Sequence, residues 1–221
     1  MNVTTVVIAT HNRKKAGEMR TILSKPFPQI ELKTLADYSG APDPEETGSS
    51  YAENATIKAE SAARFTKELC IADDAGLEID ALDGAPGLHS KRFGGEVLPF
   101  PEKMAMILEA MKGVPEEMRT ARFRCCVAVS FPPSHITHHT SQDHQPSTLD
   151  PRPSTRVFES SCEGRIAHSP SGSGGFGYDP IFFLPELNCC MADLTPDQKH
   201  AISHRGKVLK LVGDWLEKMT G

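Results

Sequence analysis

Residues 121–131 read A-R-F-R-C-C-V-A-V-S-F, and an apolar side chain occupies every second position of this stretch. A period of two is typical of a β-strand with one buried face. The run is long for a strand, so it predicts a long, curved element of a sheet. A second long strand is expected near residues 156–167, where it would pair with the first.

Between these two strands, residues 132–155 contain five prolines, several serines and threonines, and His135, His138, His139 and His144. This composition predicts a solvated surface loop. Histidines at such a spacing are potential zinc or nickel ligands, but a loop of this kind orders its ligands poorly, which disfavours a native metal site.

On the N-terminal side, residues 70–72 predict a short buried strand that delivers Asp73 and Asp74 to its end. A long helix is expected before it, from about Ser49, because apolar residues recur there at steps of three and four. The predicted buried stripe comprises Tyr51, Ala55, Ala59, Ala62, Phe65 and Leu69.

The rest of the chain also alternates between helical and strand patterns. Strands are expected at residues 3–9 and 30–35, and a helix over residues 104–111 that Gly113 closes. Asn12 is expected to cap a helix with the apolar face Ala16, Met19, Ile22 and Leu23. Thr195 and Gln198 form a predicted capping box, with Pro196 at the first helical position, before a core face of Val208, Leu209, Val212, Leu216 and Met219.

Length and composition limit the class of protein. The 221 residues are compatible with a single domain over 1–221, and 38% hydrophobic residues can form a core. A net charge of −5 makes nucleic acid an unlikely partner. No secretory signal or long hydrophobic segment is evident, so we expect a cytoplasmic protein without a membrane span. Six cysteines without a C-x-x-C pair are expected to be buried thiols.

Three polar clusters suggest phosphate chemistry. Thr10, His11, Asn12, Arg13, Lys14 and Lys15 leave a strand and enter a helix, where free backbone N–H groups and cations suit a phosphate. An exposed basic first turn explains the same residues equally well. Glu45 and Glu46 precede the long helix, and the acids at 73–74 could hold a magnesium ion that bridges to substrate phosphates. A solvated turn is the alternative for the D-D-A-G segment.

Two further clusters lie near the C-terminus. Residues 172–179 contain G-x-G-x-x-G, but Pro180 and the apolar run after it favour a strand rather than the helix of a dinucleotide site. The loop is better suited to bringing backbone groups and the ring of Phe176 or Tyr178 to a flat ligand. Lys199 lies about one helical turn before Ser203, so the polar side chains of Lys199 and of the S-H-R-G segment could face one cleft. A solvated helix face is the alternative.

Together these clusters resemble the inosine/xanthosine triphosphate pyrophosphatases, which remove non-canonical purine nucleotides. The resemblance covers nearly the whole chain. It rests on I-A-T-H-N-R-K-K (8–15), E-E-T-G-S-S-Y-A-E-N-A (45–55), I-A-D-D-A-G-L-E-I-D-A-L-D-G-A-P-G (71–87), G-G-F-G-Y-D-P-I-F-F (174–183) and S-H-R-G (203–206).

The resemblance implies a two-lobed α/β fold around a long twisted mixed sheet flanked by helices, a cleft between the lobes, and a homodimer. It also implies Mg²⁺-dependent hydrolysis of ITP, dITP and XTP to the monophosphate and pyrophosphate. Asp74 would be the catalytic base and a metal ligand, Glu46 the second metal carboxylate, and Asp73 their support. The implied substrate-binding residues are Thr10, His11, Asn12, Arg13, Lys14, Lys15, Ala75, Phe176, Gly177, Tyr178, Asp179, Lys199, His204 and Arg205.

The chain departs from the family pattern at three positions. His11 and Lys14 replace usual glycines, and Ala75 replaces the usual serine of D-D-S-G. The changes at His11 and Lys14 affect the shape of the loop and its phosphate contacts, and Ala75 removes a hydroxyl that would contact substrate. Asp74 and Glu46 are unchanged. Two other functions compete with hydrolysis. One is a nucleotide sensor that binds purines without cleaving them, and the other is a dinucleotide-dependent oxidoreductase built on the glycine loop.

Overall fold

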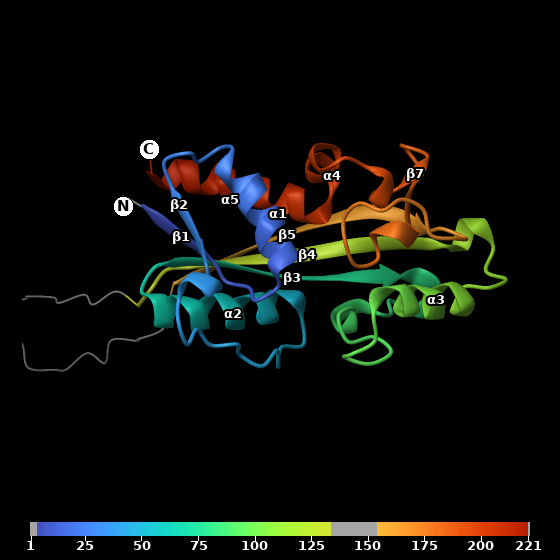
Figure 1. The fold of residues 1–221 in the computed structure, drawn as a ribbon, viewed down its shortest axis with the longest axis horizontal. Coiled ribbons are helices and arrows are strands. Elements are labelled where there is room, and N and C mark those ends of the chain that lie inside the picture. Colours follow the sequence, from blue (N-terminus) through green and yellow to red (C-terminus); the bar gives the residue numbers. More distant parts are fainter. Residues whose placement is uncertain (1–3, 134–153, 221) are drawn as a thin grey trace, which may run out of the picture.

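The computed structural model describes residues 4–133 and 154–220. Seven strands form one mixed sheet in the order β2-β1-β3-β4-β5-β6-β7. The strands are β1 (Thr5–Ile8), β2 (Glu31–Thr34), β3 (Leu69–Ile79), β4 (Thr120–Ser130), β5 (Thr155–Ile166), β6 (Phe182–Leu184) and β7 (Cys189–Cys190). The helices are α1 (Arg13–Ser24), α2 (Tyr51–Thr66), α3 (Phe100–Ala110), α4 (Pro196–Ile202) and α5 (His204–Thr220). In Figure 1, α1, α4 and α5 lie above the long strands, and α2 and α3 lie below them.

The two long strands predicted from the sequence are confirmed as β4 and β5. They pair antiparallel over their whole length, from Thr120 opposite Arg165 to Ser130 opposite Thr155. Most of the intervening segment that was predicted to be a histidine-rich loop, residues 134–153, lies outside the described residues.

The strand expected at residues 70–72 is much longer than predicted. β3 continues through the acids to Ile79, with Asp73 opposite Val127 and Asp74 opposite Cys126 of β4. The expectation that the strand ends at the two acids is therefore wrong, and so is the alternative of a solvated turn. Gly76 serves close packing instead, because a Cβ at this position would lie 2.3 Å from the carbonyl oxygen of Gly87. The strand persists because β4 supplies a continuous ladder of hydrogen bonds, which outweighs the turn preference of the local sequence.

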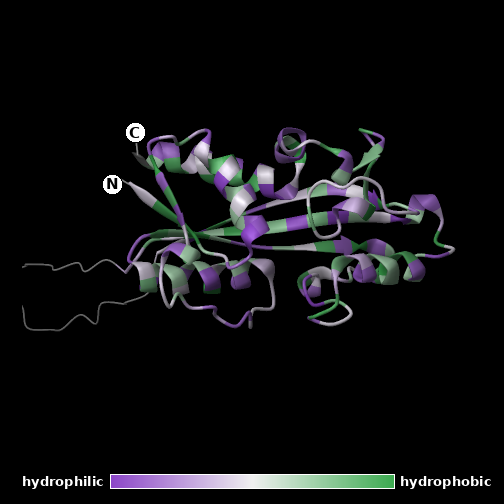
Figure 2. Cartoon of the chain, viewed as in Figure 1, coloured by the Kyte–Doolittle hydropathy of each residue, from purple (hydrophilic) through white to green (hydrophobic). Residues whose placement is uncertain are grey.

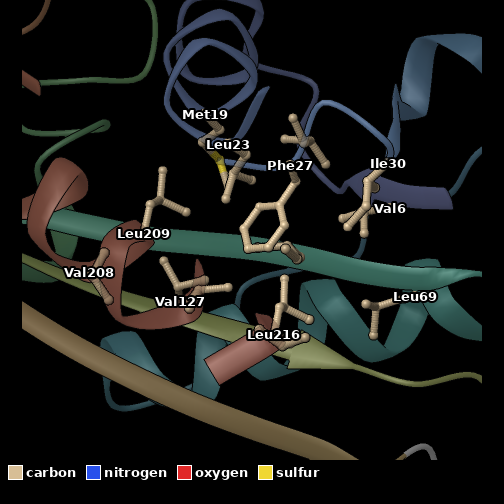
Figure 3. Packing of buried hydrophobic residues seen from close by; sticks show 14 of the residues in the cluster. Val6, Met19, Leu23, Phe27, Ile30, Leu69, Val127, Val208, Leu209 and Leu216 are labelled. Atoms are coloured by element: carbon tan, nitrogen blue, oxygen red, sulfur yellow. The ribbon is translucent and has the colours of Figure 1, made fainter. Parts of the chain in front are cut away.

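One face of the sheet packs against α1 and α5. Asn12 caps α1 as predicted, and Met19 and Leu23 point from that helix into a core that also receives Leu209 and Leu216 of α5. Figure 3 shows these side chains together with Val127 and Leu69 of the long strands, which belong to the same cluster. Fully burying one such side chain contributes about 1.5–3 kcal/mol.

The opposite face packs against α2 through small residues. Ala55, Ala59 and Ala62 are buried as predicted, and they allow the helix to approach β3 and β4 closely. Phe65 is an exception, because its side chain is 43% exposed and not part of the stripe. α2 ends one residue later, at Thr66, and Leu69 already belongs to β3.

A separate core forms at the other end of the long strands. There α3 contributes Met104 and Ile107, which pack with Leu77, Phe123 and other residues of β3 to β6. This core and the two cores beside β1 form the two lobes of the predicted α/β fold. In Figure 2 the helices carry both hydrophobic and hydrophilic residues, as expected of helices that turn one side to a sheet. No helix in residues 4–133 or 154–220 is long and apolar enough to span a membrane.

The C-terminal helical region is divided in two. The capping box at Thr195 begins α4 as predicted, but Ser203 adopts an extended backbone and separates α4 from α5. The Ser203 hydroxyl then accepts a hydrogen bond from the backbone N–H of Gly206. Met219 was predicted to be in the core, but its side chain is 36% exposed.

The approach of α5 to α4 requires glycine at position 206. A Cβ there would lie 1.7 Å from the carbonyl oxygen of His200. We expect Gly206→Ala to lower the free energy of unfolding by about 3 kcal/mol, since backbone must move to relieve the overlap. Gly17→Ala is the matched control, because a Cβ on this glycine of α1 meets nothing within 4 Å. It should raise stability by about 0.5–1 kcal/mol in the same urea titration, and equal effects would contradict the packing argument.

Candidate active site

The site begins where β1 leaves the sheet. β1 pairs with β3 only as far as Ile71, while β3 continues for eight more residues to Ile79. Beyond Ile71 no strand among the described residues pairs with that edge of β3, and an isolated bridge joins Glu78 to Pro86. A cavity of about 480 Å³ lies against this edge, with residues of both lobes in its wall.

The cavity brings together most residues that the sequence predicted for the site. Arg13 and Lys14 do not line it and lie exposed on the first turn of α1. The predicted residues that do line it are Thr10, His11, Asn12, Lys15, Glu46, Asp74, Ala75, Phe176, Gly177, Tyr178, Asp179, Lys199, His204 and Arg205.

The turn between β1 and α1 differs in one respect from the expected phosphate cradle. Asn12 Oδ1 accepts hydrogen bonds from the backbone N–H groups of Lys14 and Lys15, at 3.0 and 3.2 Å. These two groups of the first helical turn are therefore not free for a phosphate. The side chains of Thr10 and Lys15 still line the cavity, so cationic and hydroxyl side chains provide its anion-binding groups here.

Asp74 lies at the centre of an acid and amine cluster. Its carboxylate accepts hydrogen bonds from Asn54 Nδ2 and Lys58 Nζ, both at 3.2 Å. Lys58 Nζ also donates to Glu46 at 2.9 Å, so one ammonium joins the two carboxylates. Burial raises the pKa of Asp74 above its usual value, although Lys58 and Lys15 oppose the shift. A buried carboxylate of raised pKa beside open space has the properties of a proton acceptor.

Asp73 points away from this cluster. Successive side chains of a strand lie on opposite faces, so Asp73 faces α1 and α5 while Asp74 faces α2. Asp73 Oδ2 accepts hydrogen bonds from Arg205 Nη2 at 2.8 Å and Nε at 3.1 Å, and Lys15 Nζ lies 3.2 Å away. Burial disfavours its charge, but Lys15 and Arg205 outweigh burial and hold its pKa well below the usual range. Among the described residues Asp73 makes no hydrogen bond or ion pair with Asp74, Glu46 or Lys58, and its support of the metal carboxylates stays a prediction.

A buried ion-pair network extends from Asp73. Glu18 of α1 accepts hydrogen bonds from Arg205 Nη1 at 2.8 Å and from Lys199 Nζ at 2.6 Å. Lys199 also donates to Asp179 at 2.8 Å. Arg205 and Lys199 were predicted to contact substrate, and their orientation depends on these carboxylates. Both cations still lie over the ring of Phe176, within 5.6 and 4.8 Å of its centroid.

The end of the cavity near the second lobe is aromatic. Tyr178 donates its hydroxyl proton to the carbonyl of Ser90 at 2.8 Å, which joins the glycine loop to the segment after β3. His204 is buried and stacks on Phe123, with ring centroids 4.7 Å apart. Burial, with Arg205 and Lys199 nearby, lowers the pKa of His204 well below its usual value, so the ring is neutral near pH 7. Its Nδ1 has no partner among the described residues.

The glycine loop does not lead into a helix of the dinucleotide-binding type. A short 3-10 helix, Asp179–Ile181, follows it and passes directly into β6, which confirms the predicted strand. Asp179 instead accepts a hydrogen bond from the backbone N–H of Phe176 at 2.8 Å and closes the loop on itself.

Glu46 and Asp74 are the carboxylates best placed to hold a metal ion. The described residues contain no group of three or more His, Cys, Asp or Glu side chains that could hold one. A structural zinc or calcium site is therefore not supported in this part of the chain. Magnesium needs few protein ligands, since it usually keeps several waters and binds one or two carboxylates together with substrate phosphates. Two carboxylates that share one lysine beside an open cavity fit that requirement.

Sequence reasoning missed several residues of the site. Lys58 is the most important, and its signal was its position four residues after Asn54, on one side of α2 facing the acids. Glu18 is a second, since it lies one turn beyond Lys15 on α1. Ser90, Lys91 and Lys103 also line the cavity, but no local pattern indicates which side of β3 their segments occupy.

Comparisons with known proteins agree with this fold. Residues 6–215 match the model of the Ham1 family. A "dITP/XTP pyrophosphatase" of Geobacillus kaustophilus is 44% identical over 98% of this chain and 96% of the relative. One of Bacillus subtilis is 40% identical over 96% of each chain. The solved HAM1 protein of Coxiella burnetii superposes with a TM-score of 0.78 at 35% identity, covering 98% of this chain and 100% of its own. The Staphylococcus aureus Ham1 protein has a TM-score of 0.79 at 34% identity, covering 97% and 99%. The chain belongs to the Ham1 family.

Proposed function

We propose that this protein hydrolyses the purine nucleoside triphosphates ITP, dITP and XTP to the monophosphate and pyrophosphate, and so cleanses the nucleotide pool. One observation carries the proposal. A single cavity combines the Asp74, Lys58 and Glu46 cluster with the cationic turn at one end and an aromatic and basic pocket at the other. Relatives that match over nearly their whole length have the name "dITP/XTP pyrophosphatase", which supports the same reaction.

The residues divide between chemistry and binding. The Asp74 carboxylate accepts a proton from the attacking water, and its raised pKa favours that transfer. Glu46 and Asp74 would hold Mg²⁺, which supplies charge neutralisation at the phosphates when bound. Lys58 keeps the two carboxylates together before the ion arrives. Thr10 and Lys15 would bind phosphate oxygens.

The opposite end of the cavity would select the base. Donor groups there match a keto oxygen at position six of the purine and are mismatched with the amino group of adenine. The neutral His204 ring offers one donor and one acceptor at this end. Phe176, with Lys199 and Arg205 over its ring, provides an apolar surface for the base.

The test is an assay of both products. With Mg²⁺, ITP, dITP and XTP should each release pyrophosphate, at least about a hundredfold more efficiently than ATP. A metal chelator should stop the reaction. Orthophosphate as the direct product would contradict the proposal. Saturable ITP binding without any product would also contradict it and would favour the sensor function. The homodimer implied by the resemblance and the cytoplasmic location expected from the sequence remain predictions.

A further inference from the structure

Lys103 of α3 is a buried cation in the cavity wall. Its exposed fraction is only 1%, although lysine is rarely buried without a counter-charge. No carboxylate lies within ion-pair distance of its ammonium in the part of the chain that the structure describes. Burying an ammonium is costly unless hydrogen bonds compensate for the lost water, so its remaining contacts indicate its role.

Those contacts converge on the segment that follows β3. Lys103 Nζ donates a hydrogen bond to the backbone carbonyl of Lys91, and it lies 5.5 Å from the ring centroid of Phe100. The next carbonyl toward the N-terminus, that of Ser90, accepts the hydroxyl of Tyr178 at 2.8 Å. Phe100 and Tyr178 pack edge to face with centroids 5.1 Å apart. Two successive carbonyls are thus held by side chains from two different elements.

The held segment carries an exposed cation. Lys91 lines the cavity, and no ion pair of its ammonium is found among the described residues. Glu46, Lys58 and Asp74 line the same cavity. Lys91 therefore lies on the wall of the cavity in which the phosphates of a nucleotide would bind.

We propose that Lys103 is a positioning residue that fixes the backbone of Lys91 and thereby presents the Lys91 ammonium to the triphosphate. The proposal rests on the proposed function, because it names a residue that tunes binding of the same substrate. Holding the backbone in advance reduces the conformational entropy that Lys91 loses when it engages a phosphate. Lys103 itself donates to a protein carbonyl and does not need to touch substrate.

A double-mutant cycle tests this indirect role. Lys103→Met keeps the length and removes the donor, and we expect it to raise KM for ITP about tenfold with kcat within about twofold of the wild type. Lys91→Ala should raise KM similarly, and the double variant should be no worse than Lys91→Ala alone. Lys112→Met is the matched control, since this exposed lysine just beyond α3 loses the same charge far from the cavity. It should leave KM unchanged.

The opposite results would overturn the proposal. Effects that add in the double variant would show that Lys103 acts without Lys91, and an equal effect of Lys112→Met would show a general charge effect. Lys103→Arg keeps a charged donor, so its KM for ITP should stay close to that of the wild type. If Lys103 only filled space, this substitution would not preserve KM. If Lys103→Met does not fold, as judged by thermal unfolding, the cycle is repeated with Lys103→Leu, which also has no hydrogen-bond donor.

A binding measurement separates this proposal from the proposed function. Dissociation constants for ITP and for inorganic triphosphate can be measured by calorimetry in an Asp74→Asn background, where turnover is not needed. The same non-additive pattern in these constants supports the role of Lys103 even if the wild type releases no pyrophosphate. Binding of neither probe by the wild type would overturn both proposals.

Discussion

Replacing Asp74 by asparagine is expected to lower kcat for pyrophosphate release from ITP about a thousandfold, because the substitution removes the proton acceptor. The variant should still fold, since the position remains polar and Lys58 Nζ can still donate to the amide oxygen. Steady-state assays with Mg²⁺, together with the thermal unfolding midpoint, measure both effects.

Asp214→Asn is the matched control for this experiment. Asp214 makes an exposed ion pair with Lys210 on α5, so the same chemical change occurs there far from the cavity. Its kcat should equal that of the wild type. Full activity of Asp74→Asn would show that this carboxylate takes no part in the reaction. Loss of folding would show that Asp74 stabilises the fold, and the loss of activity would then not indicate a catalytic role.

Replacing Asp73 by asparagine is expected to have a different main effect, on stability. The Asp73 carboxylate is buried, and it compensates the charges of Arg205 and Lys15. Without this carboxylate, Arg205 keeps only Glu18 as an ion-pair partner among the described residues and Lys15 keeps none, so the free energy of unfolding should fall by about 3 kcal/mol at pH 7. Urea titration measures the change, and Asp214→Asn, an exposed pair of the same type, should show almost none.

The effect of Asp73 should also depend on pH in a defined direction. Its pKa is lowered in the folded state, so its contribution is fully present above the pKa of an unfolded aspartate, about 3.9. The contribution is then lost as pH falls below that value toward the folded pKa. The difference in stability between wild type and Asp73→Asn should therefore be constant from pH 7 to pH 5 and shrink in stronger acid. A difference that grows on acidification would contradict the ion-pair account.

Local features of the fold were predictable because their physical causes lie within a few residues. The cap at Asn12 and the capping box at Thr195 each need only one side chain near the first free N–H groups of a helix. The apolar alternation that predicted β4 likewise depends on one strand, although its residues from Cys125 to Ser130 are buried on both faces because helices cover both sides of the sheet. Family motifs then identified Asp74 and Glu46, and both line the cavity.

Other features depend on neighbours that are distant in the sequence. Pairing with β4 makes β3 continue through its two acids, and the strand geometry then sends Asp73 and Asp74 to opposite faces. No short-range pattern contains that information. The same holds for Phe65, which lies one helical step after Ala62 but is exposed, whereas Ala63 is buried.

The sequence by itself determined the alternating helices and strands, the family and the two carboxylates at the centre of the site. Only the tertiary structure decided what each charge faces. Asp73 became the partner of Arg205, Lys58 became the link between Glu46 and Asp74, and Lys103 came to hold a backbone carbonyl. The reason is that helical and strand periods follow from backbone geometry within one element, whereas the partner of a buried charge is set by packing between elements.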